Sequence, residues 1–255
     1  MNAAVLDLGI LTPALVAGLL VLSTHVPLGQ QVLARGIVFI DLAIAQLAGL
    51  GVIVADYLGV PAHGWAVQIA AAGAAAAGAG VLTWSERRWP QVQEALIGAL
   101  FVLAASCALL LLSNNPHGGE HLKELLAGQI LWVSWTELYR VAIFYALLLA
   151  LWFGLGPRRL GRWGFYLLFA MSVTASVQLV GVYLVFASLI LPALTAKVCK
   201  ATWRLSLGYS VGVAGYILGL AASALFDLPA GPSVVCALAI AAAGGAWLAA
   251  RRGFP

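Results

Sequence analysis

Residues 173–197 read VTASVQLVGVYLVFASLILPALTAK, an apolar run interrupted by polar residues, a glycine and a proline. Pro192 has no backbone N–H, and its ring displaces the carbonyl four residues earlier, that of Ser188. Inside hydrocarbon, a backbone group freed in this way costs several kcal/mol unless protein or water satisfies it. The stretch therefore predicts helices in a packed membrane core that line a route. An ordinary kinked core helix is the alternative.

The whole chain has the composition of a membrane protein. Of its 255 residues, 63% are hydrophobic and 9% are charged, and the mean hydropathy is +1.02. Apolar windows of about the 20 residues that cross a hydrocarbon core recur along the sequence, without the alternation of a membrane strand. We predict an all-α, polytopic membrane helix bundle of about eight or nine segments. It would form a single transmembrane domain over residues 1–255.

Basic residues gather in alternate loops, which predicts orientation because cytoplasmic loops are enriched in Lys and Arg. The clusters are Arg35; Arg87 and Arg88; Arg158, Arg159 and Arg162; Lys197, Lys200 and Arg204; and Arg251 and Arg252. The C-terminus is then cytoplasmic. The apolar window over residues 164–197 carries basic residues at both ends, so the chain must enter and return. This predicts two short paired helices, near 164–178 and 181–197, turning near residues 178–181.

Several segments carry a family resemblance. Residues 178–196, QLVGVYLVFASLILPALTA, resemble the signature of permease subunits of zinc-, manganese- and iron-uptake ABC transporters. Matches in the same order are VLTWSERRWPQVQEALIGALFV at 81–102, HLKELLAGQILWVSWTEL at 121–138 and FDLPAGPSVV at 226–235, with a looser one at 35–52. The resemblance implies a permease in the bacterial cytoplasmic membrane, paired with a second copy of itself. An extracytoplasmic metal-binding protein would feed it, and cytoplasmic ATPase subunits would drive alternating access.

The expected substrate is a divalent metal ion, with zinc first and manganese or iron as alternatives. The sequence holds no G-x-x-x-x-G-K-[ST] phosphate loop, so ATP would be bound by the partner ATPase. We therefore expect a transport subunit, not an enzyme, with no bound cofactor and no nucleic-acid partner. A different hypothesis is an ATP-independent secondary carrier or channel for a metal or small solute. The short loop GPRRLGRWG at 156–164 favours it, because the family has a longer ATPase-contacting segment there.

Five residues are predicted to form the metal pathway. Asp41 is the main expected ligand, because acids inside the membrane are rare, expensive and commonly functional. Its alternative roles are a pair with Arg35 or a helix cap. Gln46 stands where the family resemblance places a histidine, and five residues at 100° each put it about 140° from Asp41 on a regular helix. Gln178, Ser188 and Thr195 would supply polar lining.

A second candidate site lies in the predicted outer loop NNPHGGEHLKELLAG. His117, Glu120, His121 and Glu124 combine imidazole and carboxylate groups, which suit zinc or a similar divalent ion. Transient capture of metal from the binding protein is one hypothesis, and a solvated polar loop is the other. The H-x-x-E-H spacing also matches an inverted metalloprotease motif, but adjacent glycines oppose the helix that such catalysis requires.

Some further residues have predicted structural roles. AAAGAAAAGAGV at 70–81 is dense enough in small residues to let helix backbones approach closely. Glu137 and Arg140 lie one turn apart and are predicted to form an ion pair. Glu94 is placed where its charge can reach the membrane interface. The three cysteines, Cys107, Cys199 and Cys236, are read as small buried hydrophobes, not as a disulfide or zinc framework.

Overall fold

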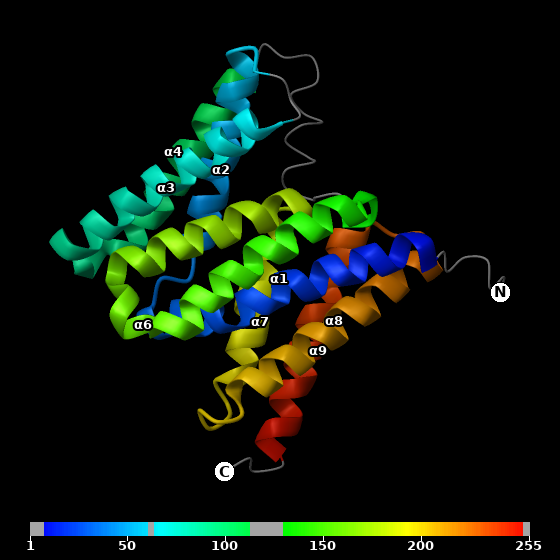
Figure 1. Ribbon diagram of the computed structural model, residues 1–255. Helices are drawn as coiled ribbons and strands as arrows, with labels where there is room; N and C mark the ends of the chain where they lie inside the picture. Colours follow the sequence, from blue (N-terminus) through cyan, green and yellow to red (C-terminus); the bar gives the residue numbers. More distant parts are fainter. Residues whose placement is uncertain (1–7, 61–63, 113–129, 252–255) are drawn as a thin grey trace. The chain divides into compact units, whose positions relative to one another are not determined.

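The computed structural model describes residues 8–60, 64–112 and 130–251, and all regular structure in these ranges is helical (Figure 1). The elements are α1 (Leu8–Arg35), α2 (Ile40–Tyr57), α3 (Trp65–Arg88), η2 (Pro90–Val92), α4 (Gln93–Leu112), η3 (Ile130–Trp132), α6 (Trp135–Val180), α7 (Val182–Ala196), α8 (Arg204–Phe226) and α9 (Ala230–Arg251). In the described part, 8 helical segments are long and apolar enough to cross a membrane. The prediction of an all-α, polytopic bundle is confirmed.

Helices α6 and α7 correct the predicted pair of short helices. α6 contains two spans, Trp135–Gly156 and Arg159–Val180, joined at a turn where Gly156 (φ 71°) and Gly161 (φ 60°) adopt left-handed backbone angles. The second span has 22 residues, so the prediction that it is short was wrong, because the span begins at Arg159 and not at the edge of the apolar window at residue 164. The predicted break is confirmed at Gly181 (φ 81°), after which α7 runs for only 15 residues.

The described chain divides into two compact units. One, here called unit 1, comprises residues 1–35, 126–147 and 179–255, and the other, unit 2, comprises residues 36–125 and 148–178. The boundary near residue 178 coincides with the break between α6 and α7. The single transmembrane domain over residues 1–255 stays a prediction.

In unit 1, glycines bring α1 and α8 into close antiparallel contact. Gly18 of α1 packs against the ring of Tyr216, and Gly208 of α8 packs against Val26. The contact partner on α8 therefore moves eight residues toward the N-terminus, from Tyr216 to Gly208, as α1 advances eight residues from Gly18 to Val26. Gly212 meets Leu22 midway between these two contacts. Small residues at four-residue spacing are typical of tightly packed membrane helices.

The turn between α8 and α9 explains the sequence FDLPAGPSVV. α8 ends at Phe226, and Asp227 takes a left-handed conformation (φ 53°), which Asp tolerates better than most residues. The Ser223 hydroxyl donates a hydrogen bond to the Leu228 carbonyl at 2.7 Å, which ties the turn to the last turn of α8. α9 then begins at Ala230, so three residues reverse the chain direction.

In unit 2, α2 packs closely on α3 through Gly51. A Cβ atom at Gly51 would lie 2.6 Å from the carbonyl oxygen of Ala70 and 2.8 Å from the Cβ of Ala74, so only glycine fits. The close packing predicted for residues 70–81 is confirmed. α2 also packs against α4, so that it lies beside both α3 and α4 (Figure 1).

The junction between α3 and α4 is held by the carboxamide of Gln93, which is 5% exposed. Its Nε2 donates to the Leu82 carbonyl at 3.0 Å and lies 3.4 Å from the hydroxyl of Tyr166 on α6, while its Oε1 accepts from the Ser85 hydroxyl at 2.9 Å. One buried amide thus joins the end of α3, the start of α4 and the second span of α6.

Replacing Gln93 by Leu is expected to lower the free energy of unfolding by roughly 1–3 kcal/mol, because the buried hydrogen-bonding contacts of Gln93 with Leu82, Ser85 and Tyr166 are lost. The thermal unfolding of the detergent-solubilised protein measures this change. Gln91→Leu is the matched control, since Gln91 is exposed in the preceding turn. Equal unfolding temperatures for the two variants would contradict the structural role given to Gln93.

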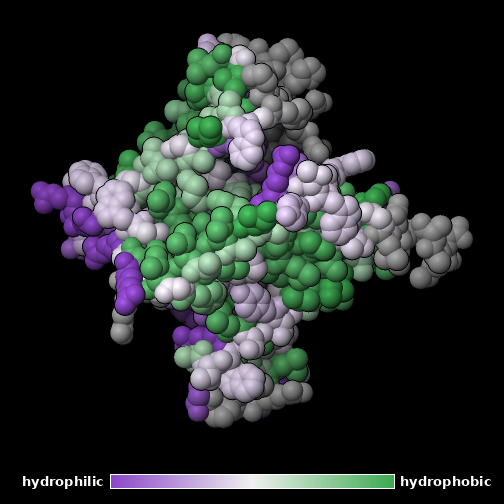
Figure 2. All heavy atoms as spheres, in the orientation of Figure 1, coloured by the Kyte–Doolittle hydropathy of each residue, from purple (hydrophilic) through white to green (hydrophobic). Residues whose placement is uncertain are grey.

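The end of unit 2 that holds the α3–α4 junction also carries residues of two predicted cytoplasmic basic clusters. Arg162 Nε lies 4.0 Å from Glu86 Oε1, and the Arg87 guanidinium lies 5.8 Å from the ring centroid of Trp163. The end of α3 and the turn of α6 therefore lie on the same side, as the orientation prediction requires. Figure 2 shows hydrophobic residues over much of the visible helix surface and hydrophilic residues at the left edge, where α3 gives way to α4.

The prediction that Glu137 pairs with Arg140 and the prediction that all three cysteines are buried were both wrong. Glu137 forms a capping box at the start of α6, in which its Oε2 accepts from the Ser134 backbone N–H at 3.0 Å and the Ser134 hydroxyl accepts from the Glu137 N–H at 3.3 Å. The S-x-x-E spacing of residues 134–137 is the signature of this motif. Among the cysteines, all three are free, but only Cys199 is buried. Cys107 and Cys236 lie on exposed faces of long apolar helices, where a small apolar side chain can face lipid.

Candidate metal pathway

Asp41 is the most unusual ionisable residue in the described chain. It lies in the first turn of α2 and is 1% exposed. Both carboxylate oxygens are buried, and neither has a hydrogen-bond partner among the residues that the structure describes. Asp41 makes no side-chain hydrogen bond that caps the start of α2, and the predicted pair with Arg35 stays a prediction. A buried, unpartnered carboxylate is costly unless a cation or a proton compensates its charge.

Gln46 does not share a face of α2 with Asp41. The helix is continuous from Ile40 to Tyr57, so the five-residue spacing separates the two side chains by about 140°. Asp41 is buried while Gln46 is half-buried. The position at which the family resemblance places a histidine is thus occupied by a neutral side chain, and this side chain lies on a different face of α2 from Asp41.

The other three predicted lining residues fall in different surroundings. Ser188 is fully buried in α7 and shares a 2.9 Å hydrogen bond with the hydroxyl of Tyr216 on α8. The Thr195 hydroxyl lies 2.9 Å from the Leu191 carbonyl and 3.2 Å from the Ala242 carbonyl of α9. Gln178 is exposed near the end of α6. Ser188 and Thr195 thus tie α7 to its neighbours, and their role as pathway lining stays a prediction.

The outer-loop candidates lie outside the described residues. His117, Glu120, His121 and Glu124 all fall within residues 113–129. Their capture of metal stays a prediction. Among the described residues, there is no group of three or more His, Cys, Asp or Glu side chains that could hold a metal ion.

Sequence reasoning missed His25 of α1, which is completely buried in unit 1. Its Nδ1 lies 3.0 Å from the Val21 carbonyl, which only accepts, so Nδ1 carries the proton. Thr24 Oγ1 is also 3.0 Å from Nδ1, and the buried Nε2 has no partner in the described part of the chain. The sequence did contain a signal for this residue, because an ionisable imidazole inside an apolar membrane segment commonly indicates a functional site.

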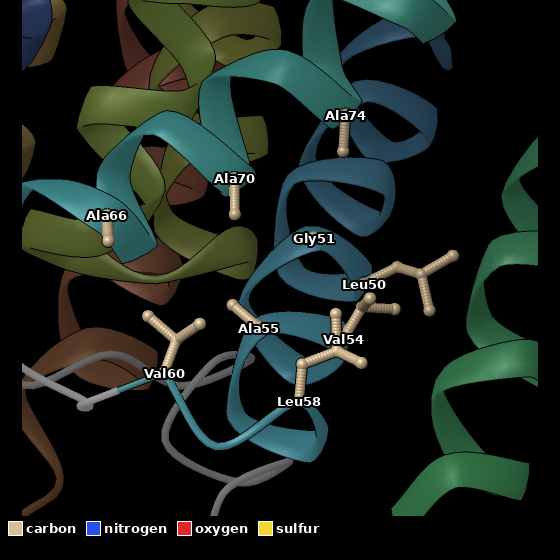
Figure 3. A pocket seen from close by; sticks show the side chains of 9 residues that line it. All are labelled: Leu50, Gly51, Val54, Ala55, Leu58, Val60, Ala66, Ala70 and Ala74. Atoms are coloured by element: carbon tan, nitrogen blue, oxygen red, sulfur yellow. The ribbon is translucent and has the colours of Figure 1, made fainter.

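Unit 2 also contains an apolar groove of about 370 Å³ between α2 and α3 (Figure 3). Leu50 and Val54 of α2 line one side, and Ala66, Ala70 and Ala74 of α3 line the other. The lining includes no charged or polar side chain. This groove therefore offers no side-chain ligand to a metal ion, and Asp41 remains the better candidate.

Comparison with known proteins gives consistent matches over nearly the whole chain. The sequence model of the ABC 3 transport family matches residues 7–156 and 150–248. The manganese transport system membrane protein MntC of Halalkalibacterium halodurans is 26% identical over 246 residues, covering 88% of this chain and 82% of that protein. The high-affinity zinc uptake system membrane protein ZnuB of Haemophilus influenzae is 25% identical over 247 residues, covering 89% and 92% respectively.

A solved structure shares the fold. PsaBC from Streptococcus pneumoniae in complex with Fab has a TM-score of 0.75 and 21% sequence identity, covering 98% of this chain and 95% of that one. At this identity the likeness shows the helical architecture alone.

Proposed function

The chain belongs to the ABC 3 transport family, and from this premise we propose that it is the permease subunit of an importer for a divalent metal ion. The proposal places it in the bacterial cytoplasmic membrane, where two copies form the pore. Cytoplasmic ATPase subunits drive alternating access, and an extracytoplasmic metal-binding protein delivers the ion. Zinc is the first candidate from the family resemblance, and manganese and iron are the others.

The observation that carries the proposal is the buried carboxylate of Asp41. Apolar spans explain how the chain sits in a membrane, but they do not explain an acid with both oxygens unpartnered. A cation that enters the path can compensate this charge, and a second conformation can release it. Transport requires binding that is strong enough for entry and weak enough for exit.

An ATP-independent carrier or channel is the second candidate. It is favoured by the turn between the two spans of α6, where only residues between Gly156 and Gly161 separate the helices. A long cytoplasmic segment for ATPase contact is therefore missing at that point.

Co-purification separates the two candidates. When the permease is expressed with its cognate ATPase and purified through a tag on the permease, we expect two permease chains and two ATPase chains in one complex. Metal uptake into proteoliposomes is expected to require ATP and the binding protein. A permease that purifies alone and transports metal without ATP would support the carrier and contradict the proposed importer.

A further inference from the structure

Glu94 of α4 reaches the start of α2, the helix turn that carries Asp41, although the two residues are far apart in the sequence. The Phe39 backbone N–H donates a hydrogen bond to Glu94 Oε1 at 3.2 Å. Phe39 immediately precedes α2, and Asp41 is the second residue of that helix. The Glu94 carboxylate is thus fixed at the same helix start as Asp41. Its second oxygen is buried, while the residue as a whole is half-buried, so the expectation that its charge reaches the membrane interface stays a prediction.

The two acids together leave three carboxylate oxygens without partners. Asp41 Oδ1 and Oδ2 and Glu94 Oε2 are buried and have no hydrogen-bond partner among the described residues. The start of α2 offers partial positive charge, and Glu94 Oε1 accepts from the Phe39 N–H there. Buried carboxylate oxygens without hydrogen-bond partners require a cation or a proton to compensate their charge.

On the basis of the proposed function, we propose that Asp41 and Glu94 form a two-carboxylate cation site at the predicted cytoplasmic end of the metal path. Each acid comes from a different helix, so the site closes only when α2 and α4 are packed together. The ion would complete its coordination with water. Gln46 cannot add an imidazole, and α2 directs it to another face.

The donor set predicts which ions the site prefers. Carboxylate and water oxygens suit manganese and other hard cations, whereas zinc gains more from imidazole and thiolate ligands. Zinc binds more tightly than manganese at most protein sites, so the oxygen donors are expected to narrow this difference and leave manganese a competent ligand. The site's placement near the predicted cytoplasmic side makes it the last binding point before release, and weak, oxygen-only coordination suits that step.

The test measures Mn²⁺ binding to the purified permease–ATPase complex in nanodiscs, using the electron paramagnetic resonance signal of free Mn²⁺. Glu94→Gln is expected to raise the Mn²⁺ dissociation constant by about tenfold or more. The glutamine Oε1 can still accept from the Phe39 N–H, so the helix cap is retained while the charge is removed. Glu94→Asp is expected to keep part of the affinity. Glu137→Gln is the matched control, because Glu137 is exposed in a capping box elsewhere.

The outcomes separate the site from the proposed function. If Glu94→Gln binds Mn²⁺ like wild type while Asp41→Asn does not, Glu94 is only a helix cap and the two-carboxylate site is overturned. A Zn²⁺ affinity that exceeds the Mn²⁺ affinity by the wide margin typical of imidazole or thiolate sites would overturn the oxygen-only donor set. If the wild-type complex binds and transports no divalent metal, the proposed function itself fails. Thermal unfolding of each variant identifies any loss that comes from misfolding.

Discussion

Asp41→Asn is expected to abolish metal uptake while the permease still folds and assembles. Asparagine has nearly the shape of aspartate but lacks the charge that would attract a divalent ion. With the ion bound, the carboxylate and the cation would form a buried charge pair, and removing one member of such a pair costs about 3–5 kcal/mol, or roughly a 100-fold or greater loss of binding. Uptake into proteoliposomes containing the permease, its ATPase and its binding protein measures the effect.

Protein stability separates this result from simple damage. Because both oxygens of Asp41 are buried without partners, removing their charge is expected to leave the unfolding temperature unchanged or raise it. Asp56→Asn is the control, since Asp56 is an exposed acid near the other end of the same helix. Unchanged uptake by Asp41→Asn, or a matching loss in Asp56→Asn, would remove Asp41 from the transport mechanism.

Much of the fold could be predicted because the signals are local. Long apolar runs need only length and composition, and the small residues at 70–81 indicate close packing wherever their neighbour lies. The break at Gly181 follows from a glycine that alone adopts its positive φ without strain. The same reasoning failed at the turn of α6. Basic and aromatic residues there suggested a loop, whereas Arg162 and Trp163 extend the helix beyond the apolar window.

The candidate site was harder to predict because it depends on neighbours. Asp41 was found because an acid in an apolar segment is itself a signal. Glu94 was not connected with it, because 55 residues separate Glu94 from its hydrogen-bond donor Phe39. Ser188 shows the opposite difficulty. A buried hydroxyl has the same appearance in sequence whether it lines a pathway or bonds a tyrosine on the next helix.

The glycines of α8 give the second large effect, which tests the fold itself. Gly208 and Gly212, and Gly215 and Gly219, form two four-residue spacings that sequence analysis did not identify. Gly215 packs on Leu238 and Gly219 on Val234, so the second pair sets the antiparallel contact between α8 and α9. At Gly219 an added Cβ would meet the Cα of Val234 and lie 2.8 Å from its backbone nitrogen. Backbone atoms cannot rotate away as a side chain can.

Gly219→Ala is therefore expected to destabilise unit 1 by about 3 kcal/mol, because α8 and α9 must separate to admit one methyl group. The expected measurement is a large drop in thermal unfolding temperature and a lower yield of folded protein. Gly244→Ala in α9 provides the matched control, since nothing lies within 4 Å of the Cβ that it adds. Alanine favours a helix over glycine by about 1 kcal/mol, so this control should be neutral or stabilising. A Gly219→Ala protein as stable as the Gly244→Ala protein would contradict the close α8–α9 contact, because propensity alone treats the two glycines alike.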